Sequence, residues 1–450
     1  MTLVADKLLD ESFASKKLWT KTETKLWTIN FFMGTCVLYA SRVALPLCAA
    51  AMAQEYGWNK SDSGTVMSCF FWGYAMIQVF AGSAADAVGG ENVLQYSTLI
   101  WSILTFFTPH LFDLAYFTSY PLVILIFVRV FTGIGQGFHL PCMASIVGRH
   151  LTSTDKGRVF GISLAGSHFG TVVAGGVGSF LISIFGWRTL FQFVGLLSLI
   201  WWYFFKALRD GSLSRSRDEI LSRGAESAGS EESLISIETG KNRKLKIDTS
   251  VPWKTLLSHP SFWAAAVAQY CGANAYFTMF SWLPMYFSDN FPDSQAVVYN
   301  VVPSLAIVIT ALASPFIASR LLSSGRSITF TRRVMESTSL VAMALCLLCV
   351  SGTSGFYLSL FIFTAAMAAR GLHHGGVSVN PHDFAPHHTG SVFGIFNAFS
   401  AITGFVGVYV AGWILQSSSN NWSYVFTFTA VQCIFGAVVY ALLGTGNKII

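Results

Sequence analysis

Long apolar stretches alternate with short polar connections along almost the whole chain. Twelve of these stretches are close to 20 residues or longer, which is the length an α-helix needs to cross the hydrocarbon core of a bilayer. They lack the two-residue alternation that is typical of a membrane β-barrel. We therefore predict an all-α polytopic membrane protein. The predicted spans are residues 26–51, 63–84, 93–112, 120–147, 158–185, 189–206, 261–287, 296–319, 331–351, 355–379, 390–416 and 423–444.

One long polar interruption divides these spans six and six. It runs from about residue 208 to residue 249 and is rich in Ser, Glu, Arg and Gly. A segment of this composition cannot bury enough apolar surface to order itself, so we interpret it as a linker. The predicted organisation is an N-terminal segment (1–25), a six-helix bundle (26–206), a linker (207–260), a second six-helix bundle (261–444) and a C-terminal tail (445–450).

Composition supports the membrane assignment. The chain is 53% hydrophobic and only 11% charged, whereas soluble domains carry roughly 25% charged residues. All eight cysteines fall within predicted spans, which favours free thiols over a disulfide framework. No Walker-type loop, zincin motif or Gly-x-Ser-x-Gly elbow is present, so nothing in the sequence indicates an enzyme or a cofactor.

The basic residues predict the orientation in the membrane. Of the 28 Lys and Arg residues, three lie deep within spans, and only Lys60 and Arg188 fall on one side. The other 23 fall on the side shared by both termini. By the positive-inside rule both termini are expected in the cytoplasm. The net charge of +6 is therefore a topology signal and does not imply a nucleic-acid partner.

The two halves resemble each other in sequence. Gly157-Arg-Val-Phe-Gly-Ile-Ser opens the fifth span, and Gly390-Ser-Val-Phe-Gly-Ile-Phe opens the eleventh. Each continues through a glycine-rich face and ends at a tryptophan, Trp187 or Trp422. A duplicated six-helix unit is typical of transporters whose substrate site lies between the repeats.

Two arginines lie deep in the first half. Arg42 is in the first span and Arg129 in the fourth, and the two helices run in opposite directions. At 1.5 Å per residue both side chains should lie about 12–14 Å below the same non-cytoplasmic face. A charge at bilayer depth costs at least ~2.5 kcal/mol, so an intramembrane arginine suggests a functional site.

These arginines have no obvious counter-ion, because the first, fourth and fifth spans contain no Asp or Glu. Guanidinium suits bidentate recognition of carboxylate or phosphate, so an anionic small-molecule substrate is the favoured partner. The alternative is that each arginine is tied to backbone carbonyls and is purely structural. Further candidates for substrate binding are Tyr39, Tyr74, Gln136, Arg370 and Asn397.

The residue one to two turns beyond Arg129 is Gln136, an amide that cannot titrate. Proton-coupled carriers usually place an Asp, Glu or His in the pathway. Uptake driven by membrane potential needs no proton site, because each charge moved gains ~2.3 kcal/mol per 100 mV. The sequence thus favours potential-driven transport.

Arg370 and several histidines lie around the tenth span and the loop after it. We interpret the histidines as residues of the membrane interface, with a pH-sensitive loop or a metal site as alternatives. Arg370 is roughly mid-span and could be a third contact for the anion. The histidines are His373, His374, His382, His387 and His388.

Three short motifs remain. Gly82, Asp86, Gly89 and Gly90 form a short connection after the second span, where a tight turn beside a carboxylate suits a gate but is also common in ordinary turns. Two N-x-S sequons begin at Asn59 and Asn421. Both lie close to a span end on the non-cytoplasmic side, so we expect little glycosylation.

The motifs taken together resemble the major facilitator superfamily, and within it the solute carrier 17 family of anion transporters. The matching stretches are Tyr39-Ala-Ser-Arg42, Gly57-Trp-Asn-Lys60, Ser68-Cys-Phe-Phe-Trp-Gly-Tyr74, Gly82…Asp86…Gly89-Gly-Glu91, Arg129…Gly133…Gly137…Pro141 and Ser378-Val-Asn380…Asp383…Ala385-Pro386. A narrower set is most similar to the vesicular nucleotide-carrying branch: Trp58-Asn-Lys60, Gly89-Gly-Glu91, Val251-Pro-Trp253, Ser281-Trp-Leu-Pro284, Phe291-Pro-Asp293 and Asn300-Val-Val-Pro303.

The resemblance implies a monomeric carrier that loads ATP, ADP and related anions into secretory vesicles or lysosomes. It implies that the lumen-positive potential of a vesicular proton pump drives uptake, that chloride is a possible activator, and that Arg42 and Arg129 meet the phosphates. Gln136 and Met67 replace residues that are glutamate and histidine in proton-linked or glutamate-carrying members, which fits the nucleotide branch. Ala87 replaces a usual basic residue, which leaves the gating role of Asp86 open.

Two other functions remain as alternatives. One is transport of another organic anion or phosphate (sialic acid, glutamate, urate or inorganic phosphate) with proton or sodium coupling. The other is a membrane sensor or scaffold that has kept the carrier fold but does not transport.

Overall fold

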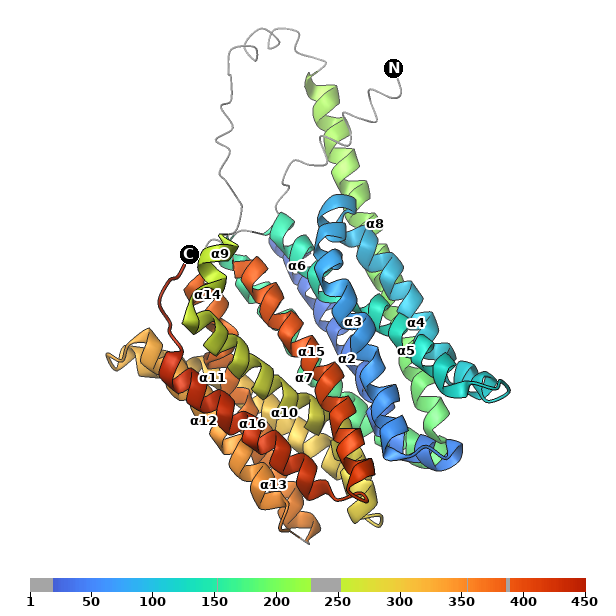
Figure 1. Cartoon of the computed structure of the whole chain (residues 1–450). Helices are drawn as coiled ribbons and strands as arrows, with labels where there is room; N and C mark the ends of the chain where they lie inside the picture. Colours follow the sequence, from blue (N-terminus) through green and yellow to red (C-terminus); the bar gives the residue numbers. More distant parts are fainter. Residues whose placement is uncertain (1–18, 152, 228–251, 354, 386–388) are drawn as a thin grey trace.

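A computed structural model gives the structure of the chain and describes residues 19–151, 153–227, 252–353, 355–385 and 389–450. The part of the chain described is helical and contains no strand (Figure 1). The first half comprises α2 (Lys21–Tyr56), α3 (Lys60–Val88), α4 (Gly90–Ala115), α5 (Pro121–Gly137), α6 (His139–His150), α7 (Ser153–Phe185) and α8 (Trp187–Ser227). The second half comprises α9 (Trp253–Leu257), α10 (Pro260–Asn290), α11 (Ala296–Ser323), α12 (Ile328–Val350), α13 (Phe356–Gly371), the 3₁₀ turns η1 (Leu372–Gly375) and η2 (Val377–Val379), α14 (Asn380–Phe384), α15 (Thr389–Ser417) and α16 (Trp422–Leu443).

The predicted membrane architecture is confirmed. Ten helical segments among the described residues are long and apolar enough to cross a membrane. The helices α3 and α10 match the other two predicted spans, which completes a set of twelve. Two spans are interrupted: the fourth passes from α5 to α6 at Phe138, and the tenth passes through η1 and η2 before α14. All eight cysteines are free, as predicted.

The helices form two bundles that meet along three pairs of helices (Figure 1). Within the first bundle α2 packs on α7 and α3 packs on α5, and within the second α12 packs on α16 and α11 on α13. Contacts between bundles pair α3 with α15, α7 with α11 and α2 with α10. The fifth and eleventh spans, which carry the repeated sequence, are α7 and α15, so the duplicated elements both lie at the bundle interface.

Glycines allow α3 and α5 to pack at backbone distance. A Cβ atom built on Gly73 would lie 2.0 Å from the carbonyl oxygen of Val130, and one built on Gly133 would lie 2.0 Å from that of Phe70. No side chain fits at either position, and small residues are the usual means of close approach between membrane helices. This contact fixes Phe70 against the helix that carries Arg129.

The two ends of the described chain lie on one side of the molecule, which we call the terminal side; the opposite side is the far side. Helix α2 begins and α16 ends on the terminal side, and the amide of Ile449 donates to the carbonyl of Phe384 at 2.8 Å. Lys60 and Arg188, at the starts of α3 and α8, lie on the far side. The structure therefore places these two basic residues on the same side, as the sequence predicted.

The sixth span is longer than predicted. We expected it to end at residue 206, with a structureless linker beginning directly after it, but α8 continues to Ser227. Extending an existing helix carries no nucleation cost, because each added residue gains one backbone hydrogen bond. The end of α8 projects beyond the bundle (Figure 1), and composition did not predict that this stretch is helical.

The two bundles are closed against each other on the far side. The Lys60 ammonium and the Asp289 carboxylate form an ion pair of 2.5 Å between α3 and α10. A Cβ atom on Gly64 would lie 3.1 Å from the Cα of Gly412 on α15, so these helices also touch through backbone. The amide of Asn300 on α11 donates to the hydroxyl of Ser179 on α7 at 2.9 Å.

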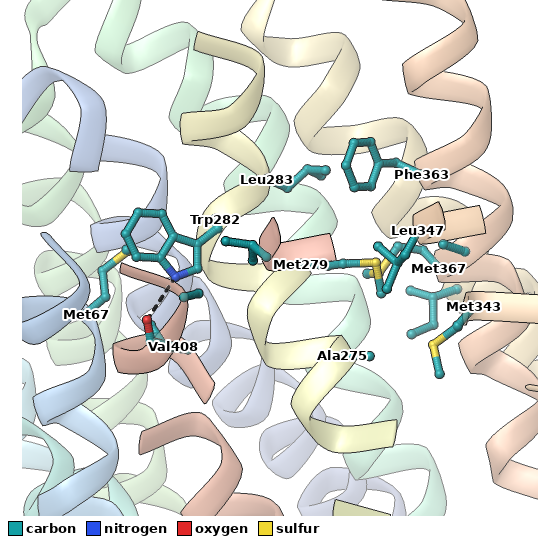
Figure 2. Close-up of a cluster of buried hydrophobic side chains, with 14 of the residues drawn as sticks. Met67, Ala275, Met279, Trp282, Leu283, Met343, Leu347, Phe363, Met367 and Val408 are labelled. Atoms are coloured by element: carbon teal, nitrogen blue, oxygen red, sulfur yellow. Dashed lines mark hydrogen bonds between the residues drawn. The ribbon is translucent and has the colours of Figure 1, made fainter. Parts of the chain in front are cut away.

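Trp282 of α10 fills the core of this closure. Its indole N–H donates to the carbonyl of Val408 at 3.1 Å, and Met67 of α3 lies beside the ring (Figure 2). Both Trp282 and Met67 are buried. The far side is thus sealed by a dry apolar layer with an ion pair at its rim.

Candidate functional site

A cavity of about 520 Å³ lies between the bundles, on the terminal side of this closure. A volume of this size is typical of small-molecule sites. Its lining extends from Tyr39, near the middle of α2, to Pro381 near the terminal side. Both bundles contribute, and the polar lining residues are Tyr39, Ser167, His168, Gln269, Tyr276, Arg370, His373, His374, Ser378, Asn397 and Ser400.

The charge of this lining is one-sided. Arg370 is a permanent cation, three histidines accompany it, and the lining residues include no Asp or Glu. Two amides of the second bundle, on α10 and α15, are also present: Gln269 donates to Ser400 at 2.5 Å, and Asn397 donates to Gln78 at 3.2 Å. The cavity can accept an anion and can hydrogen-bond a polar group, but offers no partner to a cation.

Arg42 lies in a box of aromatic rings beside this cavity. Its guanidinium carbon is 4.6 Å from the ring centre of Tyr39, 4.5 Å from that of Tyr74 and 5.5 Å from that of Phe70. The aromatic faces lower the cost of burying the charge, because a cation over a ring is attracted by its quadrupole. Tyr39 and Tyr74, two of the predicted substrate-binding residues, therefore both contact Arg42.

Arg129 reaches the same aromatic box from α5. Its guanidinium carbon lies 5.2 Å from the ring centre of Phe70, which Arg42 also contacts. The equal depth predicted for the two arginines is consistent with this shared ring. No carboxylate of the described residues pairs with either arginine, and both are buried.

Gln136 connects the arginine pair to the rest of the first bundle. The Nε atom of Arg42 donates to Gln136 at 3.0 Å, and the Gln136 amide donates to the hydroxyl of Ser41 at 3.0 Å. The hydroxyl of Ser41 lies 3.0 Å from that of Thr105. This network fixes the Arg42 side chain and leaves its Nη2 atom, and Nε of Arg129, buried without a partner among the described residues. Buried donors of this kind normally have a partner.

Tyr39 separates the arginine pair from the cavity. It lines the cavity and also stacks under Arg42, whereas Arg42, Arg129, Tyr74 and Gln136 do not line the cavity. Of the predicted substrate-binding residues, the structure thus brings Tyr39, Arg370 and Asn397 to the open cavity. The other four do not line it: Arg42 contacts Tyr39, Tyr74 and Gln136, and Arg129 shares the Phe70 ring with Arg42.

The interpretation of the histidines as interfacial is wrong for two of them. His373 is buried within the second bundle, where its Nδ1 atom lies 2.8 Å from Glu336, and His374 lines the cavity. The chain breaks from α13 into η1 at this point, so side chains that would have reached the membrane surface turn inward. His382 is exposed, while His387 and His388 lie outside the described residues. No group of three or more potential ligands for a metal ion occurs in the part of the chain described.

Most of the predicted gating motif lies in helices and not in the connection that we expected: Gly82 and Asp86 belong to α3, which continues to Val88, and Gly90 begins α4. Gly89 alone separates α3 from α4 and has a φ of +96°, a conformation that glycine adopts without strain. Gly90 packs against the backbone of Cys142 on α6. Gly82 has open space around it, and the side chain of Asp86 lies outside the described residues.

Sequence reasoning missed two ionisable residues inside spans. Glu336 on α12 is fully buried and accepts from the Val377 amide at 3.0 Å, and His168 on α7 lines the cavity. The rule that drew attention to Arg129, namely that a titratable residue in an apolar span suggests function, applies equally to both.

Known proteins resemble this chain over nearly its full length. The model of the Major Facilitator Superfamily matches residues 31–408. The human protein named voltage-gated purine nucleotide uniporter SLC17A9 is 33% identical over 96% of this chain and 94% of its own length. A rice protein named probable anion transporter 4, chloroplastic, is 30% identical over 96% of this chain and 71% of its own.

Solved structures agree on the fold. A bacterial homolog of the human lysosomal transporter Spinster superposes with a TM-score of 0.73, covering 94% of this chain and 98% of that one at 13% identity. The D-xylose-proton symporter gives a TM-score of 0.66 over 94% of this chain and 98% of that one, at 12% identity. The chain therefore belongs to the Major Facilitator Superfamily and, within it, to the solute carrier 17 group of anion transporters.

Proposed function

We propose that this protein transports purine nucleotides, ATP and ADP among them, down the electrical gradient across an intracellular membrane. The observation that carries the proposal is the 33% identity to a purine nucleotide uniporter along 96% of the chain. The cavity chemistry supports it, because a lining with Arg370 and no carboxylate suits a polyanion. Its amides and aromatic rings offer contacts to a planar base.

Alternating access supplies the mechanism. The far side is closed by Trp282, the Gly64–Gly412 contact and the Lys60–Asp289 ion pair. An anion enters the cavity from the terminal side and reaches Tyr39. Displacement of Tyr39 then exposes the buried donors of Arg42 and Arg129 to the phosphates, and the anion leaves when the far side opens. Binding drives this change only as far as the anion binds one state more tightly than the other.

The membrane potential supplies the energy in this proposal. Gln136, which accepts a hydrogen bond from Arg42, is an amide that cannot carry a proton, and no carboxylate of the described residues pairs with either arginine. A tetra-anion instead gains ~2.3 kcal/mol per charge for each 100 mV that it crosses. In this proposal the terminal side faces the cytoplasm. A vesicle or lysosome whose lumen a proton pump makes electrically positive would then accumulate the nucleotide. Chloride activation and the monomeric state belong to the same proposal.

A second candidate is transport of another organic anion or phosphate. It is favoured by the 29–30% identity of plant relatives, one of them named sodium-dependent phosphate transport protein 1, chloroplastic, from Arabidopsis thaliana. The arginine pair would serve a carboxylate as well as a phosphate. The alternative predicts that unlabelled phosphate, glutamate, sialate or urate competes with ATP for uptake.

Reconstitution separates these possibilities. Purified full-length protein in liposomes should take up labelled ATP when a lumen-positive potential is imposed, and unlabelled ADP should compete. Competition by phosphate or an organic acid but not by ADP would support the second candidate. Binding of ATP without uptake would support a sensor or scaffold.

A further inference from the structure

We propose that Arg370, His168 and His374 form a distinct phosphate subsite, which binds the phosphate chain before the anion reaches Arg42 and Arg129. This deepens the proposed function, because it assigns the first contact of the anion to the second bundle and to α7. The three side chains come from α7, α13 and η1 and all line the cavity. The rings of His168 and His374 lie 5.7 Å apart, centre to centre.

The Arg370 guanidinium has donors to spare. It makes no hydrogen bond with any described residue, and its Nη1 atom is buried without a partner. The residue is only 8% exposed, yet it lines the cavity. A buried cation with unused N–H groups carries a desolvation penalty that a bound anion would offset.

The nearby carboxylate does not fill this role. Glu336 is close enough to interact electrostatically with Arg370, but forms no ion pair with it within 4 Å. Its Oε2 atom instead accepts from His373 at 2.8 Å and from the Val377 amide at 3.0 Å. Glu336 therefore lowers the positive potential at Arg370 without a hydrogen bond to it. The guanidinium remains available to a ligand.

Gly272 of α10 leaves the space that Arg370 occupies. A Cβ atom at this position would lie 2.8 Å from Nη1 of Arg370 and 3.2 Å from Leu340. The guanidinium therefore depends on the absence of a side chain at Gly272. This gives a way to move the charge without removing it.

The chemistry of the three groups selects phosphate. A guanidinium offers two parallel N–H donors to phosphate oxygens, and each neutral imidazole adds one more donor. Neither His168 nor His374 hydrogen-bonds a described residue, so both are available. Because His168 belongs to the first bundle and Arg370 to the second, a phosphate chain held by both would draw the bundles together and promote closure of the terminal side.

Equilibrium binding to the purified full-length protein tests this subsite. The probes are inorganic tripolyphosphate, which lacks a base, together with ATP, AMP and adenosine. We expect wild-type affinity to rise with the number of phosphates. Arg370→Gln should weaken tripolyphosphate and ATP by about 10- to 100-fold, as expected for lost charge-assisted hydrogen bonds, and should leave adenosine unchanged.

Three further variants make the test specific. Gly272→Ala should weaken tripolyphosphate although no charge is removed, and Arg370→Lys should recover part of the loss in Arg370→Gln. Arg320→Gln removes the same charge from an exposed position on α11 and should have no effect. Tripolyphosphate affinity that is unchanged in Arg370→Gln, or equally lowered in Arg320→Gln, would overturn the subsite. If the protein binds tripolyphosphate through Arg370 but does not bind nucleotides, the subsite is upheld and the proposed function is refuted.

Discussion

At the residue scale, the ring of Phe70 organises the interior of the first bundle. Arg42 and Arg129 both lie over it, and no described carboxylate neutralises either one. Arg42 is also held by Gln136, whereas Arg129 makes no hydrogen bond with a described residue and keeps a buried Nε donor without a partner there. Arg129 is therefore the side chain with most to gain from an anionic ligand.

Replacing Arg129 tests this directly. Arg129→Gln should abolish potential-driven ATP uptake in liposomes, because the phosphates lose a desolvated cation. The variant should still insert and fold, since removing an unpaired buried charge does not leave another charge unpaired. Size-exclusion profiles and thermal unfolding serve as the folding control. Normal uptake by the variant would show that Arg129 is structural.

A glycine substitution tests how closely Phe70 is positioned. Gly133→Ala places a methyl group against the carbonyl of Phe70 and should destabilise the protein by about 1–3 kcal/mol, the usual cost of overpacking. Gly148→Ala on α6 has open space around it and should not destabilise. Thermal unfolding in detergent compares the two, and equal stability of both variants would contradict the close α3–α5 contact.

At the element scale, the far-side closure depends on an ion pair between bundles. Lys60→Glu should favour opening of the far side, and the double variant Lys60→Glu, Asp289→Lys should restore closure. The effect is modest, about 0.2–1 kcal/mol or a few-fold in population, because both side chains are partly exposed. Its measure is the labelling rate of a cysteine introduced at Ala311 on the cavity wall, with exposed Cys349 replaced by Ser. No rescue by the double variant would argue against the pairing.

Both sequon asparagines are helix N-caps, which places them at span ends as the expected lack of glycosylation requires. The Asn59 side chain accepts from the Asp62 amide at 2.8 Å, and the Asn421 side chain accepts from the Ser423 amide at 3.0 Å. Each side-chain carbonyl oxygen thereby caps the start of a helix, α3 or α16, so both asparagines lie at a helix end. We expect no mass change on treatment of the protein from mammalian cells with an N-glycosidase. A shift that disappears in Asn59→Gln or Asn421→Gln would refute this.

The pattern of apolar residues predicted the membrane-spanning helices better than it predicted the breaks within them. The apolar runs located all twelve spans because burial in lipid requires a continuous run of about 20 residues. The break from α13 into η1 has no comparable pattern in the sequence. Gly371, Gly375 and Gly376 lie at this break, but glycine is also common inside membrane helices. As a result the inward positions of His373 and His374 could not be predicted.

The site was predictable in part. Arg42, Arg129 and their neighbouring tyrosines could be proposed because a charge in an apolar span is costly. Which of these residues faces the cavity could not, since that depends on how the two bundles meet. Tyr39 lines the cavity and contacts Arg42, whereas Arg42 itself does not line it.

At the scale of the whole molecule, the duplication would let one sequence provide the two access states of the proposed mechanism. The equivalent helices α7 and α15 each pack against a helix of the opposite bundle, α7 against α11 and α15 against α3. Closure on the far side leaves the cavity on the terminal side, and a rocking motion about these contacts would exchange the two. The arginine pair and Arg370 lie near the centre of this motion, in different bundles.

The central claim is that the membrane potential drives nucleotide transport by this protein. Uptake by the reconstituted protein, with the membrane potential and the proton gradient varied independently, tests it directly. The account predicts that a lumen-positive potential alone drives ATP uptake into liposomes containing the purified protein, that a proton gradient alone does not, and that Arg129→Gln removes the uptake while Arg320→Gln retains it. Absence of uptake under the potential, or full uptake with the proton gradient alone, would contradict it.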